Sequence, residues 1–425
     1  NINYKNIHIM SRVTFNGQTT NQIEQLNNVN LTGNSVYIGK NAAPTNTSGS
    51  NAIIIGSEAG KQSVLAEDSI FIGVRSGFSS SSSDRDNIFI GKDTGHFNRL
   101  GTSNVFVGNN AGKFNNSGTN NIFIGQNSGR DNNEGLSNVF LGALSGAQNT
   151  SGSENVFIGN EAGFKNYVGG NNVFVGKGTG RNNYFGNDNV FIGKDAGKDN
   201  NRGSGNVFLG YQSGLDNSVG DNNTFIGKEC GKNNKEGDTN CFIGHLTGSN
   251  NTKGSNNVMI GPLSGQNNMY GNSNIYMGIR SGMNSVGSHK NVFIGEQCGM
   301  NNRKGFNNVY IGASCGENSV ASKNNIFMGF RSGYNNNHAN SSFTIISALD
   351  VNNINLTHVL SNMETIENFV HDFEFTLVYR SFIGEVSLTV PARKQLTLKY
   401  NVDSPTAHAM SVYQKQLENN GYELV

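Results

Sequence analysis

The sequence predicts an all-β fold, a parallel β-solenoid (β-roll) of about 18 coils. A short apolar triplet runs into a glycine 18 times, and the interval between these glycines is 17 residues except for one of 18, between Gly73 and Gly91. The chain also holds 56 glycines and only 4 prolines. A fixed short period over about 300 residues indicates a stacked array in which each unit contacts its neighbours, and not a globular enzyme with one central cleft. The repeat glycines are Gly39, Gly56, Gly73, Gly91, Gly108, Gly125, Gly142, Gly159, Gly176, Gly193, Gly210, Gly227, Gly244, Gly261, Gly278, Gly295, Gly312 and Gly329.

Residues 1–33 precede the repeat and are expected to cap it or attach it to a base. Ile7–Ile9 and Val13–Phe15 have the composition of short strands, and Asn16-Gly17 is a tight-turn signal. A bare terminal coil would expose an edge that recruits other chains, so a capping role is expected here.

Residues 34–342 form the predicted solenoid shaft, and the segment from Asn189 to Gly205 represents one coil. Val190-Phe191-Ile192 is β-branched and aromatic and is bounded by Asn and Gly, which is typical of a strand. A glycine every few residues excludes a helix. At about 4.8 Å per coil, 18 coils would extend about 85 Å.

Glycine is expected at the corners of each coil. A glycine follows every triplet and recurs four residues later in 17 of 18 repeats and ten residues later in 13. Glycine alone adopts positive φ without steric cost. The Asn before the triplet is expected to accept a left-handed backbone and to link its amide along the array. The corner glycines for which we expect this role most clearly are Gly91, Gly108, Gly125, Gly142, Gly159, Gly176, Gly193 and Gly210.

The triplet is apolar on both faces of the predicted strand. Val190 and Ile192 point one way and Phe191 the other, and the middle residue is Phe or Tyr in 16 of 18 repeats. A narrow coil buries only one face in its own core, so the other needs a cover. The simplest cover is another copy of the chain, as a cyclic homotrimer or homodimer. The aromatic ladder includes Phe89, Phe106, Phe123, Phe140, Phe157, Phe174, Phe191, Phe208, Phe225, Phe242, Phe293 and Phe327.

This interpretation requires a specific location for the aromatic column, at a contact between subunits. We expect a sheet that is apolar front and back to be shared between identical subunits. An aromatic column found inside a single chain, or lying uncovered in water, would contradict the fibre that this reasoning predicts.

Residues 343–425 are expected to form a small α+β domain that caps the shaft, trimerises it or binds a receptor. Apolar residues from Val359 to Val370 recur at helical spacing, and Thr406–Asn419 also has a helical pattern. Alternating runs at 373–379, 386–390 and 396–400 predict strands, with Pro391–Lys394 as a hairpin connection.

Composition and motifs argue against catalysis and against several partners. The formal net charge is +1 and no apolar stretch approaches the length of about 20 residues that spans a bilayer, so we expect neither nucleic-acid binding nor membrane insertion. His371, Asp372 and Glu374 are the tightest ionisable cluster, and they are interpreted as the polar face of a strand. With no catalytic motif in context, we expect no enzyme activity, no catalytic or metal residues and no cofactor.

The four cysteines do not predict a disulfide framework. Cys230, Cys298 and Cys315 lie three residues after a repeat glycine, where every repeat has Ala, Ser, Thr or Cys. A small buried side chain is therefore expected there. An inter-coil bridge between Cys298 and Cys315 stays open, and zinc is disfavoured because no Cys-x-x-Cys pair accompanies them.

The pattern Asn-Val-Phe-Ile-Gly, followed by Ala/Ser-Gly and Asn-x-x-Gly, resembles the head repeats of trimeric autotransporter adhesins. It is even more similar to the longer repeats of phage tail fibres and of surface fibres of large viruses. The best local match to the adhesin form is Asn34–Gly39, and the resemblance covers Asn34 to Ser342. It implies a left-handed, trimeric β-roll with the apolar strands packed toward the three-fold axis.

Departures from the adhesin pattern favour a viral fibre. Adhesin heads of that family have a shorter period, and this sequence shows no heptad stalk, membrane-anchor strands or C-terminal self-cleaving chaperone. The sequence therefore predicts a non-enzymatic structural fibre or spike on a virion surface, or otherwise extracellular. Its expected partners are itself, a base at one end and a host glycan or protein. The alternatives are a bacterial trimeric adhesin head and a glycan-degrading tailspike.

Overall fold

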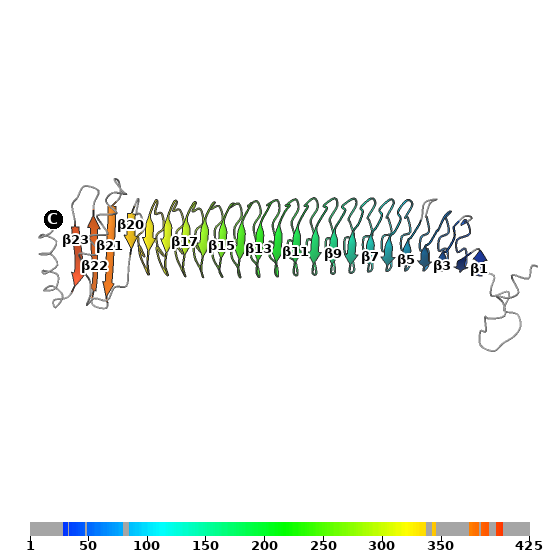
Figure 1. The fold of residues 1–425 in the computed structure, drawn as a ribbon, viewed down its shortest axis with the longest axis horizontal. Coiled ribbons are helices and arrows are strands. Elements are labelled where there is room, and N and C mark those ends of the chain that lie inside the picture. Colours follow the sequence, from blue (N-terminus) through cyan, green and yellow to red (C-terminus); the bar gives the residue numbers. More distant parts are fainter. Residues whose placement is uncertain are drawn as a thin grey trace, which may run out of the picture. The chain divides into compact units, whose positions relative to one another are not determined.

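The computed structural model describes residues 29–32, 34–46, 49–79, 85–336, 342–345, 374–381, 384–390 and 397–402. The chain divides into two compact units, Asn1–Asn138 and Val139–Val425. Both contain β-solenoid coils with one short strand per coil (Figure 1). The predicted 17-residue parallel β-solenoid is confirmed in both.

The first unit contains seven strands, and six of them stack in parallel. Successive strands pair in register, so that Phe89 lies beside Phe106 and Phe106 beside Phe123. The single 18-residue interval leaves the register intact, since Phe71 still pairs with Phe89. β1 runs antiparallel to β2 and covers the first coil. The strands are β1 (Val29–Thr32), β2 (Ser35–Ile38), β3 (Ile53–Ile55), β4 (Ile70–Ile72), β5 (Ile88–Ile90), β6 (Val105–Val107) and β7 (Ile122–Ile124).

The second unit continues the same pattern with twelve coil strands and a different end. β20 adds in parallel to β19, β21 adds in parallel to β20, and β22 and β23 follow as antiparallel neighbours. The coil strands are β8 (Val139–Leu141), β9 (Val156–Ile158), β10 (Val173–Val175), β11 (Val190–Ile192), β12 (Val207–Leu209), β13 (Thr224–Ile226), β14 (Cys241–Ile243), β15 (Val258–Ile260), β16 (Ile275–Met277), β17 (Val292–Ile294), β18 (Val309–Ile311) and β19 (Ile326–Met328). The last strands are β20 (Ser342–Ile345), β21 (Glu374–Ser381), β22 (Gly384–Val390) and β23 (Thr397–Val402).

The aromatic residue in the middle of each triplet forms the core of the coils. Phe174, Phe191 and Phe208 are fully buried. Their rings stack with centroids 4.8 and 4.6 Å apart and planes within 5° of parallel. This spacing matches the distance between hydrogen-bonded strands, so the strand pairing itself sets the ring stacking.

Three glycine positions recur in most coils, and they are required for two different physical reasons. Gly193 and Gly197 have φ of +130° and +55°, and a Cβ on Gly193 would lie 2.5 Å from the carbonyl oxygen of Gly210. Gly203 has no positive φ, but a Cβ there would collide with Oδ1 of Asn200 and with the next coil. Corner glycines therefore provide left-handed backbone at two positions and close approach at the third.

Two further positions in most coils have positive φ without being glycine. Asp188 and Asp195 have φ of +57° and +56°, and the equivalent residues of other coils include Glu, Leu and Arg. Asn189, the residue before the triplet, is not among them. The expectation that this Asn accepts a left-handed backbone is wrong, because the neighbouring residue at 188 makes that turn.

Two columns of buried asparagines bind each coil to the next. Asn189 donates from its backbone N–H and from Nδ2 to Oδ1 of Asn172, at 3.0 Å each, and from Nδ2 to the Gly203 carbonyl at 2.9 Å. Asn200 donates to Oδ1 of Asn183 and to the Gly203 carbonyl, both at 2.7 Å. All these asparagines are fully buried. The expected amide link between coils is therefore present, and it satisfies polar groups that water cannot reach.

Several predicted elements lie outside the described residues. These are the strands at Ile7–Ile9 and Val13–Phe15, the helical patterns at 359–370 and at Thr406–Asn419, and the connection at 391–394. The predicted strands near 373–379, 386–390 and 396–400 correspond to β21, β22 and β23. The boundaries at 33 and 342 and the α+β character of the last segment stay predictions.

We expect Phe191→Ala to lower the free energy of unfolding by about 3–5 kcal/mol, since it leaves a void between two stacked rings. Lys177→Ala, at an exposed position in the preceding repeat, is the matched control and should change it by less than about 0.5 kcal/mol. Urea unfolding followed by circular dichroism measures both. Equal, small losses in the two variants would mean that the aromatic column does not hold the coils together.

Candidate functional site

The outer face of the strands carries an aliphatic stripe, formed by the first and third residues of each triplet. In the second unit, Ile192 is 40% exposed and Leu209 is 38% exposed. The partners at the first position, such as Val190, are partly buried. Because the strands are in register, these side chains form two adjacent apolar columns on the outside of the coils.

The aromatic column needs no second subunit, which corrects the sequence-based reasoning. Phe191 and its equivalents are fully buried inside one chain. A coil closed by glycine corners is wide enough to hold one ring per coil, so the ladder is an internal core. The argument that an aromatic column inside a single chain excludes a fibre is also too strong, because the opposite face of the same strand remains apolar and exposed. The case for shared packing depends on the aliphatic stripe alone.

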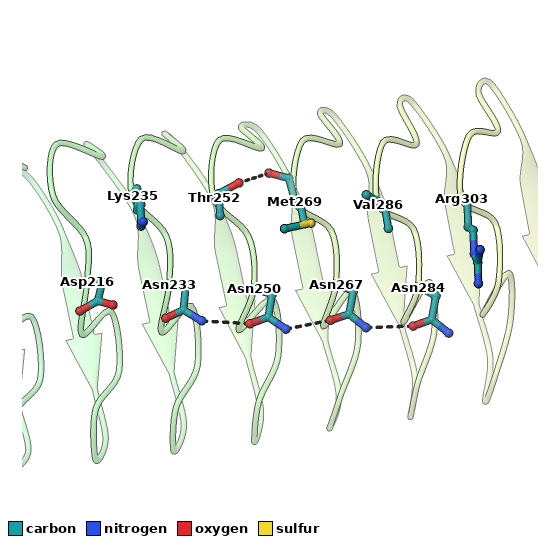
Figure 2. A pocket seen from close by; sticks show the side chains of 10 residues that line it. All are labelled: Asp216, Asn233, Lys235, Asn250, Thr252, Asn267, Met269, Asn284, Val286 and Arg303. Carbon is teal, nitrogen blue, oxygen red and sulfur yellow. Dashed lines mark hydrogen bonds between the residues drawn. The ribbon is translucent and has the colours of Figure 1, made fainter.

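A second surface feature is a groove in the second unit, with a volume of about 590 Å³, here called the amide groove (Figure 2). Two rows of side chains line it, one from each of two positions in successive coils. The first row is Asp216, Asn233, Asn250, Asn267 and Asn284, and the second is Lys235, Thr252, Met269, Val286 and Arg303. None of these residues belongs to the aliphatic stripe.

The asparagines of the amide groove are linked to one another along the stack. Nδ2 of Asn233 donates to Oδ1 of Asn250 at 2.9 Å, and Asn250 donates in the same way to Asn267 at 2.8 Å. Asn267 donates to Asn284 at 2.9 Å, and the chain continues to Asn301 at 2.8 Å. These side chains are partly exposed, so the row is a surface ladder, unlike the two buried ones.

Two carboxylates interrupt this ladder at its N-terminal side. Asp199 and Asp216 occupy the same position in neighbouring coils, just before Asn233. Desolvation and the negative charge of Asp199 raise the pKa of Asp216, against the opposing effect of Lys235. The ionised form of Asp216 is therefore disfavoured in the folded chain.

The cysteines lie where a small buried residue was expected. Cys230, Cys298 and Cys315 are fully buried, and all four cysteines of the chain are free. Sγ of Cys298 donates to the carbonyl of Tyr310, and Sγ of Cys315 donates to that of Phe327, both at 3.2 Å. Burial raises the pKa of the Cys230 and Cys298 thiols, which disfavours the reactive thiolate form of these two residues.

The described residues bring together no cluster of three or more His, Cys, Asp or Glu that could hold a metal ion. His371 and Asp372 lie outside the described residues, and Glu374 opens β21. Within the described part of the chain, no helix has the length and hydrophobicity needed to cross a bilayer.

Sequence reasoning missed the amide groove, although the signal was present. In seven consecutive coils an asparagine lies six residues after the repeat glycine, at Asn233, Asn250, Asn267, Asn284, Asn301, Asn318 and Asn335. The high asparagine content of the chain hides this column, because other asparagines recur at two buried positions. A comparison of the chain with protein-family models, curated proteins and solved structures finds no match in any of the three.

We expect Asp216→Asn to raise the free energy of unfolding at pH 7, because it removes the repulsion from Asp199 and adds one amide to the ladder. The pKa of Asp216 is raised by folding, so the ionised carboxylate costs stability. Wild type should lose stability relative to the variant as the pH rises above about 4, where unfolded Asp ionises.

Urea unfolding of both proteins between pH 3 and pH 7 measures this difference. Asp188→Asn, at an exposed position with a backbone that Asn also tolerates, serves as the control. A difference between wild type and Asp216→Asn that stays constant with pH would contradict the argument.

Proposed function

We propose that the chain is a non-enzymatic structural protein of a fibre or spike on the surface of a virus or phage, assembled as a homo-oligomer. The aliphatic stripe is the observation that carries this proposal. Most coils add two exposed or half-exposed aliphatic side chains to it, and Thr224 and Cys241 replace one of the two in their coils. Extended apolar surfaces of this kind mark sites of association.

A second copy of the same chain fits the stripe better than an unrelated partner. Two copies have the same strand spacing of about 4.8 Å, so their side chains can interdigitate in step along many successive coils. Cyclic symmetry closes such an assembly without leaving a free stripe. The trimer is the form that the resemblance to trimeric fibre repeats implies, with the stripes of three copies around the common axis.

In this proposal the two ends of the chain attach the fibre to its base and contact the host. Residues 1–33 attach the fibre to a base on the virion, and residues 343–425 cap it, trimerise it or contact a host receptor. The coils themselves act as a spacer, because each stacks only on its neighbours. The location that follows is the virion surface or another extracellular setting.

A bacterial trimeric adhesin head is the alternative that the repeat supports. Asn34–Gly39 carries the adhesin-like core and forms β2 and its corner in the first unit. The genes that flank the coding sequence discriminate between the two proposals. Capsid or tail genes support the virion fibre, and a coiled-coil stalk with an anchor barrel in the same reading frame supports the adhesin.

We expect the triple substitution Ile192→Lys, Leu209→Lys and Ile226→Lys to convert the oligomer into a folded monomer. Three ammonium groups in the aliphatic stripe would be desolvated in the interface, while in the monomer they remain in water. Light scattering coupled to size exclusion, with native mass spectrometry, measures the mass, and circular dichroism checks the fold.

The matched control is Val168→Lys with Val219→Lys. These valines are 46% and 41% exposed but lie outside the stripe, so the control should keep the oligomeric mass of the wild type. A wild-type chain that is monomeric at micromolar concentration in mild buffer would refute the shared stripe and, with it, the proposed fibre.

A further inference from the structure

The amide groove is a surface feature that neither the core nor the aliphatic stripe uses. It crosses successive coils from Asp216 to Arg303, and the coils between these two residues each add one residue to each of its two rows. Its volume of about 590 Å³ lies within the range of about 300–1,000 Å³ that is typical of ligand sites. Its direction along the stack favours an elongated ligand.

Each asparagine of the row keeps hydrogen-bonding capacity after the ladder is formed. Asn250 uses one Nδ2 hydrogen for Asn267 and accepts one bond from Asn233 at Oδ1. A primary amide has two donor hydrogens and two acceptor lone pairs. One donor and one acceptor per rung therefore remain for a ligand, repeated at the strand spacing of about 4.8 Å.

Hydroxyl groups of a ligand match this repeated pair of one donor and one acceptor better than peptide groups do. A hydroxyl donates and accepts at once, and its hydrogen rotates to suit the partner. An extended peptide presents its N–H and C=O groups to one side only every second residue, about 6.8 Å apart. That repeat falls out of step with the rungs within two coils, whereas hydroxyls distributed along a sugar chain do not require a fixed step.

The centre of the amide groove is uncharged and partly apolar. Thr252, Met269 and Val286 face the asparagines across it, and Thr252 already donates its hydroxyl hydrogen to the Met269 carbonyl at 2.9 Å. The thioether and the valine methyls can pack against the C–H faces of a sugar ring. Charged side chains occur only toward the two ends, at Asp216, Lys235 and Arg303. A neutral ligand is therefore favoured over a polyanion.

We propose that the amide groove binds an extended, uncharged oligosaccharide that lies along the stack of coils. The asparagine rungs hold its hydroxyls, and Met269 and Val286 contact its ring faces. This proposal deepens the host-attachment role proposed above. It rests on that role only for the source of the glycan, which would be the host surface. The binding itself depends on one chain and not on the oligomeric state.

The experiment is isothermal titration calorimetry of the full chain with cellohexaose, maltohexaose and chitohexaose. A heparin-derived hexasaccharide is the polyanion probe, and an extended uncharged peptide is the peptide probe. We expect at least one neutral hexasaccharide to bind. Asn250→Ala with Asn267→Ala should weaken it at least tenfold, and Val286→Trp, which fills the groove, should abolish binding. Asn318→Ala, in the same ladder but outside the groove, should bind as wild type does.

Two outcomes would overturn the proposal. One is that no neutral hexasaccharide binds, including the case in which only the heparin fragment or the peptide does. The other is that binding is the same in the Val286→Trp chain, which would locate the ligand elsewhere. Either result leaves the mass of the oligomer unchanged, so a failure here is distinguishable from a failure of the shared aliphatic stripe.

Discussion

The in-register pairing of each strand with the next is the constraint on which the other features depend. Val190, Phe191 and Ile192 pair with the equivalent residues of the neighbouring coils, 17 residues away on either side. Once the register is fixed, every position of the coil becomes a column. Rings then stack on rings, amides bond to amides, and the glycine after each triplet, such as Gly193, faces the backbone of the next coil.

The same register produces surfaces with opposite chemistry from one short sequence unit. On the strand, alternation places the ring inside and the aliphatic residues outside. On the far turns, the amide side chains of successive coils reach one another and form an external ladder. The residue type at an outer position can change from coil to coil without disturbing the core. One such position holds Asp199 and Asp216 in two coils and Asn233 in the next. Surface function can therefore be local even though the fold is uniform.

The sequence was sufficient for the solenoid, the period, the strands and the buried position of the cysteines, because these depend on spacing and residue size. It did not decide which face of the triplet lies inside, since Phe191 and its flanking residues are all apolar. Only the width of the closed coil settles that question. The left-handed backbone at Asp195 was missed because its equivalents in other coils include Glu, Leu and Arg. At Asp188 most equivalents are Asn, Asp or Ser, but that turn was assigned to the following Asn189. The amide groove depends on a column of asparagines that composition alone makes inconspicuous.

The close approach at the corners limits how such a chain can vary. A methyl group at Gly193 would meet the carbonyl oxygen of Gly210, and Oδ1 of the buried Asn189 already accepts two hydrogen bonds from Asn206. A single-residue insertion must therefore avoid these packed positions, and the one 18-residue interval, between Gly73 and Gly91, leaves the strand pairing intact. A whole coil, by contrast, presents the same upper and lower face as its neighbours. Gain or loss of complete 17-residue units is the change that this architecture accepts most readily, and it would alter reach while leaving the cross-section as it is.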